Sequence, residues 1–464
     1  MVAQKRIPGG CVIEKWNPED PVFWAEQGSK AAYRNLWVST PALLLAFAVW
    51  MVWSTVVVEL PNIGFKFTTE ELFWLVSLPG LSGATLRIFY SFMVPIFGGR
   101  NWTVITTASL LLPALGMGYA VQDVSTPYWV FLVLALFSGF GGGNFASSMS
   151  NISFFFPKAQ KGLALGINAG LGNLGVSAVQ FFVPLVTSFA LFGDALGAPQ
   201  AWNKAGVSKQ LWLQNGAFVW VPLIALVTIL ALFMMNNLAT AKASFKEQSI
   251  IFKRKHNWLM CVLYTGTFGS FIGYSAGFPL LIKTQFPDQN PLQYAFLGPL
   301  VGALVRPLGG WLADKIGGAR VTFWNYIFMT AAVFGVLNFL GSKDFFGFLT
   351  MFILLFLTTG IGNGSTFRMV PVIFLNEREK AAAGKDKAAQ ENAVKEASKE
   401  SAAVIGFSAA IAAYGAFIIP KSFGFSMAQT GGPQAALYGF VVFYAICLVI
   451  TWWFYSRKGA EAPC

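Results

Sequence analysis

The sequence predicts an all-α membrane protein with about twelve transmembrane helices, arranged as two parallel six-helix repeats. Composition predicts the membrane: 55% of the residues are hydrophobic and 11% are charged, with a mean hydropathy of +0.59, whereas roughly 25% of the residues of a soluble domain are charged. An internal repeat predicts the two halves. Arg87 and the Gly98-Gly99 pair after it recur as Arg306 and Gly317-Gly318, at an offset of 219 residues.

The apolar stretches give the elements in order. A helix needs about 20 apolar residues to cross the hydrocarbon of a bilayer, and about twelve stretches approach that length. We predict spans at residues 36–60, 70–95, 102–121, 128–152, 160–190, 213–236, 257–283, 291–312, 320–341, 346–375, 401–424 and 433–456.

The distribution of Lys and Arg predicts the topology. Most of the 32 basic residues fall on one side if both termini are cytoplasmic, as the positive-inside rule requires. We therefore expect a multi-pass membrane protein with both termini in the cytoplasm. The expected parts are a cytoplasmic N-terminal segment at 1–36, six-helix bundles at 37–236 and 257–457, a cytoplasmic linker at 237–256 and a cytoplasmic tail at 458–464.

Several classes of function are disfavoured. The net charge of +12 is spread over short loops, so it calls for no nucleic-acid partner. The first 20 residues mix charges without an apolar core, so we expect no cleaved signal peptide. The four cysteines show no paired spacing, and we find no phosphate loop, metal-ligand cluster or nucleophile–base pair. We expect no enzyme activity, no cofactor and no metal.

Arg87 and Arg306 are the main candidates for a functional site. Arginine stays charged in proteins and a charge in lipid is costly, so each must face protein or an aqueous cavity. Arg87 lies about 11 residues, roughly 16 Å, from the inner end of its predicted helix, too deep for snorkelling. The nearest acids, Glu59, Glu70 and Glu71, lie near outer ends. We therefore predict a central anion site, with structural ion pairs as the alternative.

Arg368 is interpreted differently. It lies about two helical turns from the predicted inner end of the tenth span, within snorkelling range, and the fourth span has no equivalent. We favour a structural role for Arg368, with a place on the inner exit path as the alternative.

Two spans are rich in Gly and Ala at matching places in the two halves. Small residues let helices approach closely in lipid, so we expect packing, and also sliding or rocking of these helices. Asn173 and Ser408 would then face the cavity. The glycines concerned are Gly166, Gly170, Gly172 and Gly175 in the fifth span, and Gly406 and Gly415 in the eleventh.

Two polar segments lie on the predicted cytoplasmic side. Residues 376–400 are rich in Ala, Lys and Glu, and we predict a solvated, partly helical linker there. The short loop from Gly310 to Arg320 carries Asp314 and resembles the loop motif of the major facilitator superfamily, in which the Asp and basic residues lock an inner gate. The counterpart from Ile96 to Arg100 lacks the Asp.

The chain as a whole resembles the NarK-type nitrate/nitrite porter family of the major facilitator superfamily. Beside the buried arginines, the resemblance is carried by Ser91 to Arg100, Gly143 to Met149, Gly166 to Gly175 and Gly406 to Gly415. It implies the major facilitator fold and a transporter of nitrate and nitrite in the bacterial cytoplasmic (inner) membrane. Ala412, Ala413 and Ala416 stand where the family often has glycine, and Tyr414 is bulky.

The resemblance also implies a set of site residues. Two arginines would clamp the anion, two phenylalanines would stack on its faces, a tyrosine would hydrogen-bond it and an asparagine would line the site. In this sequence they are Arg87 and Arg306, Phe145 and Phe268, Tyr264, and Asn173.

Two uncompensated positive charges should disfavour reorientation of an empty carrier. We therefore expect alternating access with obligate exchange of nitrate for nitrite by a monomer in the bilayer, serving nitrate assimilation or anaerobic nitrate respiration. The only histidine, His256, is placed in a cytoplasmic loop. Proton symport through Glu59, Glu70 or Glu71, transport of another small anion, and an anion channel stay open as alternatives.

Overall fold

The computed structural model describes residues 12–204, 206–241, 249–384 and 386–464. The chain forms two compact units, Met1–Ala243 and Ser244–Cys464. Residues 242–248 of the predicted linker, residues 1–11 of the predicted N-terminal segment, and Lys385 lie outside the described residues.

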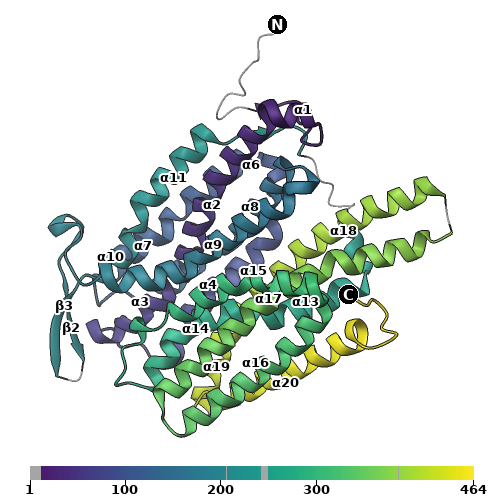
Figure 1. The fold of residues 1–464 in the computed structure, drawn as a ribbon. Helices are drawn as coiled ribbons and strands as arrows, with labels where there is room; N and C mark the ends of the chain where they lie inside the picture. The colour runs from purple at the N-terminus through teal and green to yellow at the C-terminus, as the bar shows by residue number, and fades with distance from the viewer. Residues whose placement is uncertain (1–11, 205, 242–248, 385) are drawn as a thin grey trace. The chain divides into compact units, whose positions relative to one another are not determined.

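The first unit is mostly helical, with one antiparallel β-hairpin (Figure 1). Its elements are β1 (Val12–Ile13), α1 (Pro21–Phe23), η1 (Trp24–Gly28), α2 (Ser29–Met51), α3 (Trp53–Glu59), η2 (Leu60–Ile63), α4 (Thr69–Tyr90), α5 (Met93–Phe97), α6 (Gly99–Ser109), α7 (Leu111–Ala120), α8 (Tyr128–Phe155), α9 (Lys158–Val186), η3 (Gly193–Leu196), β2 (Gln200–Lys204), β3 (Val207–Leu211), α10 (Asn215–Phe218), α11 (Trp220–Met234) and β4 (Asn237–Leu238).

The second unit is helical throughout its described elements. They are η4 (Ser249–Lys253), α13 (Lys255–Tyr264), η5 (Thr265–Gly269), α14 (Ser270–Gln285), η6 (Pro291–Gln293), α15 (Leu297–Ile316), α16 (Gly318–Gly341), α17 (Phe345–Ala382), α18 (Lys387–Ala413), α19 (Gly415–Thr430), α20 (Gln434–Thr451) and η7 (Trp452–Ser456).

Eleven helices in the described residues are long and apolar enough to cross a membrane. The seventh predicted span, 257–283, is not among the eleven, although α13, η5 and α14 are continuous there. The physical reason is that polar and small residues lower the mean hydropathy of this segment. They include Asn257, Thr267 and Ser275, which are completely buried inside the second unit.

The repeated Gly-Gly pairs have the same structural role in both units. Gly98 and Gly317 adopt φ values of +83° and +94°, a region that side chains with a Cβ rarely adopt. Each glycine ends one helix and allows the next to begin at Gly99 or Gly318. The 219-residue repeat is therefore also a repeat of backbone geometry.

Glycines bring the arginine-bearing helices into close contact with their neighbours. A Cβ on Gly83 of α4 would press against the backbone of Gly142 in α8, and a Cβ on Gly360 of α17 would overlap the backbone of Gly302 in α15. Small residues permit this close approach. In lipid, where helices gain no hydrophobic driving force from associating, the van der Waals contacts of such close packing stabilise the helix pair. In each unit the arginine is thus carried by a helix in backbone contact with a glycine-rich partner.

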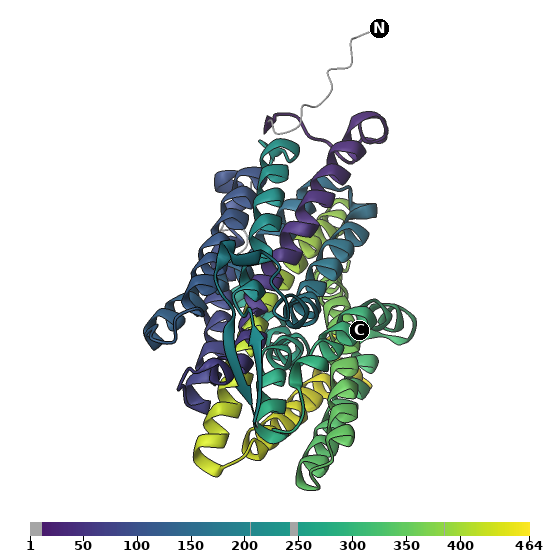
Figure 2. The ribbon, with the colours of Figure 1, turned by 90° about the vertical axis from the view of Figure 1, so that its left-hand side faces the viewer.

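The β2–β3 hairpin was not predicted; it lies in the connection between the fifth and sixth spans and faces the viewer in Figure 2. Nε1 of Trp202 donates a hydrogen bond to Glu59 (2.5 Å), and Nζ of Lys209 lies 4.4 Å from the centre of the Trp202 ring. Glu59 also accepts a hydrogen bond from Asn62 (2.8 Å). Glu59 therefore anchors the hairpin to the end of the first span.

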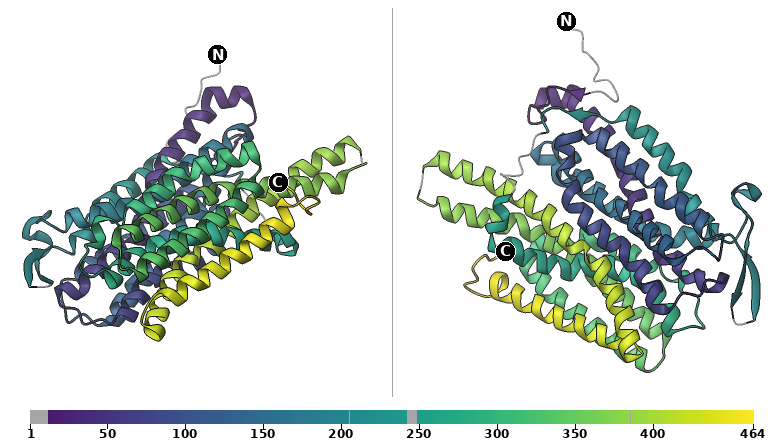
Figure 3. Two further views of the ribbon diagram at one scale, coloured as in Figure 1. Left: turned by 60° about the horizontal axis from the view of Figure 1, so that its bottom comes forward. Right: turned by 180° about the vertical axis from the view of Figure 1, so that it is seen from behind.

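The prediction that 376–400 is solvated and partly helical is confirmed for the described residues, most of which are exposed and lie in helices, but the sequence did not predict that these helices continue the tenth and eleventh spans. α17 continues to Ala382, and α18 starts at Lys387, where Asp386 accepts a hydrogen bond from the Ala389 N–H (3.0 Å). The two helices form a hairpin that extends beyond the ends of α16 and α20 (Figure 3). Alanine, lysine and glutamate are strong helix formers, so a composition that resembles a solvated linker is equally suited to a helix.

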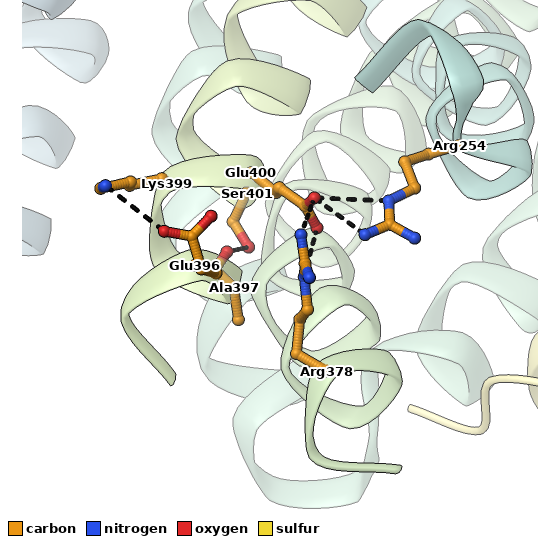
Figure 4. Close-up of polar contacts among 7 residues, drawn as sticks. All are labelled: Arg254, Arg378, Glu396, Ala397, Lys399, Glu400 and Ser401. Carbon is orange, nitrogen blue, oxygen red and sulfur yellow. Dashed lines mark hydrogen bonds and ion pairs between the residues drawn. The ribbon is translucent and has the colours of Figure 1, made fainter. Parts of the chain in front are cut away.

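Glu400 links the two helices of this hairpin to each other and to the start of α13 (Figure 4). Its side chain is 3% exposed. It accepts hydrogen bonds from Arg254 Nη2 (2.9 Å) and from Arg378 Nε (3.1 Å). These ion pairs join the start of α13 to α17 and α18, so one buried acid ties together three helices of the second unit.

The placement of His256 in a loop was wrong, because α13 begins one residue earlier, at Lys255. His256 is 1% exposed and its Nδ1 lies 2.9 Å from the Tyr455 hydroxyl. Burial lowers the pKa of His256, against the attraction of the Glu377 and Glu461 carboxylates at 3.6 and 3.5 Å. It packs at the ends of helices rather than facing solvent.

Candidate anion-binding residues

Arg87 is completely buried in the first unit. Its Nε donates a hydrogen bond to the carbonyl of Gly142 in α8 (3.0 Å). The guanidinium carbon lies 4.8 Å from the centre of the Phe145 ring and 5.3 Å from that of Trp50. Cation–π contacts of this kind gain strength away from water. The structure thus brings together Arg87 and Phe145, as the resemblance implied, and adds Trp50.

Arg306 is less enclosed in the second unit. Its Nη2 donates a hydrogen bond to the Tyr264 hydroxyl (3.2 Å), and its guanidinium carbon lies 5.4 Å from the centre of the Phe367 ring. Its Nη1 is buried and has no hydrogen-bond partner among the described residues, although the side chain as a whole is only half-buried. A buried N–H donor without an acceptor costs free energy, and a bound group that accepts its hydrogen bond removes this cost.

Tyr264 and Phe268 form one aromatic surface. Their rings are stacked, with centres 5.4 Å apart and an angle of 14° between planes. Phe268 lies in η5, a π-helical turn within the seventh predicted span, and such turns are frequent at functional sites. The sequence predicted both residues but not the π-helical turn that follows Tyr264.

Asn173 and Ser408 are buried in their respective units, at 2% exposure each. The Ser408 hydroxyl donates to the carbonyl of Ile405 (3.3 Å), within its own helix. Oδ1 of Asn173 is buried without a hydrogen-bond partner in the described part of the chain. Among the described residues, neither Asn173 nor Ser408 forms a hydrogen bond with Arg87 or Arg306. Their role in binding therefore stays a prediction.

Asn144 and Asn363 were not singled out by the sequence reasoning, although the offset of 219 residues relates them. They lie in α8 and α17, the partners of the arginine-bearing helices. Both are buried, and Oδ1 of each has no hydrogen-bond partner among the described residues. Applying the arginine offset to the rest of the chain finds this pair directly.

The predicted glycines divide into two groups. Added Cβ atoms on Gly172 and Gly175 of α9 would overlap Leu43 and the backbone of Leu44 in α2, and one on Gly415 would overlap the backbone of Gly269. These three glycines allow close helix packing. An added Cβ on Gly166, Gly170 or Gly406 meets nothing within 4 Å among the described residues.

We expect Gly415→Ala to destabilise the protein by about 1–3 kcal/mol, because the added methyl overlaps a backbone that cannot move aside cheaply. Gly406→Ala is the matched control. It lies in a helix with open space around it, so alanine should be neutral or stabilise by about 0.5–1 kcal/mol. Thermal unfolding in detergent measures both, and equal midpoints for the two variants would contradict the packing role of Gly415.

Asp314 forms an ion pair with Arg368, and both side chains are about half exposed. The pair joins the end of α15 to α17 within the second unit. It gives Arg368 a structural partner, in agreement with the favoured interpretation. Because both groups are solvated, the pair contributes at most about 1 kcal/mol to stability.

The outer acids also have structural partners. Glu59 binds Trp202 and Asn62, as described above. Glu71 forms a capping box with Thr68 at the start of α4, in which its carboxylate accepts from the Thr68 N–H (2.8 Å) and its own N–H donates to the Thr68 hydroxyl (3.2 Å). Such caps satisfy the free N–H groups of a helix start, so local structure accounts for the positions of Glu59 and Glu71.

The membrane-length helices, the repeat and the paired arginines define a multi-pass membrane transporter with two related halves. Residues 42–384 match the family model of the Major Facilitator Superfamily. The chain is 51% identical to the nitrate/nitrite transporter NarU of Escherichia coli (strain K12), over 99% of each chain. It is 44% identical to the probable nitrate/nitrite antiporter NarK2 of Thermus thermophilus, over 98% of this chain and 99% of that one. The chain belongs to the major facilitator superfamily and, within it, to the family of NarU and NarK2.

Solved structures agree on the fold. A bacterial homologue of the human lysosomal transporter Spinster, in an inward-facing and occupied conformation, superimposes with a TM-score of 0.61 at 12% identity. The match covers 90% of this chain and 95% of that one. At this identity the likeness concerns the fold alone, which confirms the predicted fold class.

Proposed function

We propose that this protein exchanges nitrate for nitrite across the bacterial cytoplasmic membrane by alternating access. The names of NarU and NarK2 support the substrates, and that of NarK2 supports exchange. The observation that carries the proposal is the pair of repeat-related arginines, Arg87 and Arg306, each with its guanidinium held against aromatic rings. A guanidinium offers two parallel donors, which suit a flat oxyanion.

The proposed roles of the two arginines and Tyr264 follow the contacts within each unit. Arg87 and Arg306 bind the anion, and Tyr264 holds Arg306 and donates a hydrogen bond from its hydroxyl to the anion. The remaining roles are assigned from position: stacking for Phe145 and Phe268, lining for Asn173 and Ser408, and gating for Asp314. Among the glycines, Gly172, Gly175 and Gly415 pack helices together, and Gly166, Gly170 and Gly406 leave room for helices to slide.

Electrostatics favours exchange over proton symport. An empty site would hold two uncompensated positive charges, and one bound monovalent anion removes half of that excess, so the loaded carrier reorients more readily. Symport needs a titratable group on the pathway. Glu59 and Glu71 are engaged in a hairpin contact and a helix cap, and His256 packs against Tyr455 and two carboxylates.

The deciding experiment is uptake of labelled nitrate into proteoliposomes that contain nitrite, nitrate, or neither. We expect rapid uptake with either anion inside and at least a tenfold lower rate in empty vesicles. Empty vesicles given an inward proton gradient separate exchange from symport. Uptake driven by that gradient without an internal anion would contradict exchange, and competition by a carboxylate or phosphate as strong as that by nitrite would contradict the substrate assignment.

The proposal includes a membrane orientation and a state of assembly. Both termini face the cytoplasm, as the distribution of basic residues predicts, and the monomer is the transporting unit. No cofactor or nucleic acid takes part, and the protein is a carrier rather than an enzyme. A reporter fused to the tail at 458–464 should be active on the cytoplasmic side, and activity on the opposite side would overturn this topology.

A further inference from the structure

The indole of Trp50 occupies a slot beside Arg87. A Cβ added to either Gly83 or Gly142 would overlap this ring. Gly83 is one helical turn before Arg87, and the carbonyl of Gly142 accepts the hydrogen bond from Arg87 Nε (3.0 Å). The two glycines that let α4 and α8 approach therefore also accommodate Trp50.

Two contacts fix the orientation of this ring. Nε1 of Trp50 donates to the carbonyl of Pro79 in α4 (2.7 Å). The ring also packs edge to face with Phe47, with ring centres 5.5 Å apart. Trp50 has no exposed surface. Trp50 can therefore act on a ligand only through a neighbouring residue. Arg87 is a charged neighbour, and its guanidinium carbon lies 5.3 Å from the centre of the Trp50 ring.

We propose that Trp50 is a positioning residue for the anion site: it holds the Arg87 guanidinium in one orientation by a cation–π contact within a slot formed by Gly83 and Gly142. This inference rests on the proposed role of Arg87 in binding nitrate. An arginine side chain loses rotamer entropy when it is held in one geometry, and a guanidinium that is already oriented loses less on binding. Tryptophan has the strongest cation–π face of the aromatic residues.

The repeat shows that this arrangement is specific to the first unit. At the offset that relates the two arginines, Gly269 stands in the place of Trp50. Arg306 instead contacts Phe367, which is carried by α17, and donates to Tyr264. Arg87 is completely buried while Arg306 is half-buried. Arg87 is therefore the more enclosed of the two arginines.

The test compares Trp50→Phe with Trp53→Phe by nitrate binding to purified protein and by nitrate/nitrite exchange. Trp53 is the matched control because it is also buried, at 1% exposure, and its Nε1 also donates one hydrogen bond, to Ser138 (3.0 Å). We expect Trp50→Phe to raise the Kd and KM for nitrate about three- to tenfold. The maximal exchange rate should change less than KM, and Trp53→Phe should leave the Kd unchanged. Equal Kd values for the two variants would overturn the proposal.

Fluorinated tryptophans at position 50 keep the test valid if Trp50→Phe does not fold. Fluorine withdraws electrons from the ring face while the indole shape and the Nε1–H donor remain. We expect the Kd to rise with each added fluorine at position 50 and to stay constant for the same series at position 53. A Kd independent of fluorination at position 50 would contradict a cation–π role. Failure of the wild-type protein to bind nitrate, or normal binding by Arg87→Lys, would instead contradict the proposed function.

Discussion

Arg87→Lys is expected to lose most nitrate transport, by about 10- to 100-fold, while the protein remains folded. Lysine keeps the positive charge but lacks the planar fork that presents two parallel donors. It also cannot reproduce the hydrogen bond from Nε to Gly142 together with the cation–π contacts of the guanidinium with Phe145 and Trp50. Losing one hydrogen bond to a charged group costs about 1.5–3 kcal/mol, which corresponds to this range.

Arg457→Lys is the matched control for this prediction. Arg457 also donates from Nε to a carbonyl, that of Trp453 (2.9 Å), and its guanidinium carbon lies 4.0 Å from the ring of the same residue. It makes the same types of contact after the last helix of the chain. Exchange in proteoliposomes should be near normal for Arg457→Lys. Similar rates for the two variants would remove the basis for an arginine-specific site.

Glu400→Gln is expected to lower the free energy of unfolding by about 3 kcal/mol. The carboxylate is 3% exposed and lies between Arg254 and Arg378 (Figure 4). Removing its charge leaves two arginines with a neutral partner in a buried place, which costs far more than an exposed pair contributes. The expected effect lies at the low end of the range because the arginines are 31% and 24% exposed.

Glu396→Gln provides the comparison one helical turn earlier. Glu396 pairs with Lys399 at 3.4 Å on an exposed face of α18, so we expect a change of about 0.5 kcal/mol or less. Thermal unfolding in detergent should separate the two variants clearly. A midpoint for Glu400→Gln as high as that for Glu396→Gln would mean that the three helices are held by packing alone.

The sequence could predict the arginines because their physics is local. A permanent charge inside an apolar stretch is anomalous whatever surrounds it, and repetition of Arg87 with its Gly-Gly pair at Arg306 made the anomaly specific. Glycine is also locally informative. Gly98 and Gly317 have a positive φ in the structure, and the spacing alone placed both at helix ends.

Partners from distant segments could not be predicted in this way. Trp50 reaches Arg87 only because Gly83 and Gly142 let two helices close around it, and Phe367 reaches Arg306 across α15 and α17. Glu400 is surrounded in the sequence by Lys and Ala, and its burial depends on two arginines from elsewhere in the second unit.

The sequence by itself determined the membrane class, the two-fold repeat and the two arginines, since hydropathy and an intramembrane charge depend on the residue and its near neighbours. Tertiary structure alone decided how each arginine is held: Arg87 is buried in cation–π contact with Phe145 and Trp50, and Arg306 is half-buried against Tyr264 and Phe367. It also decided that 376–400 is a helical hairpin closed by Glu400. The reason is that the burial and the pairing of a side chain depend on which helices pack together, and this packing cannot be predicted from the residues next to it in the sequence.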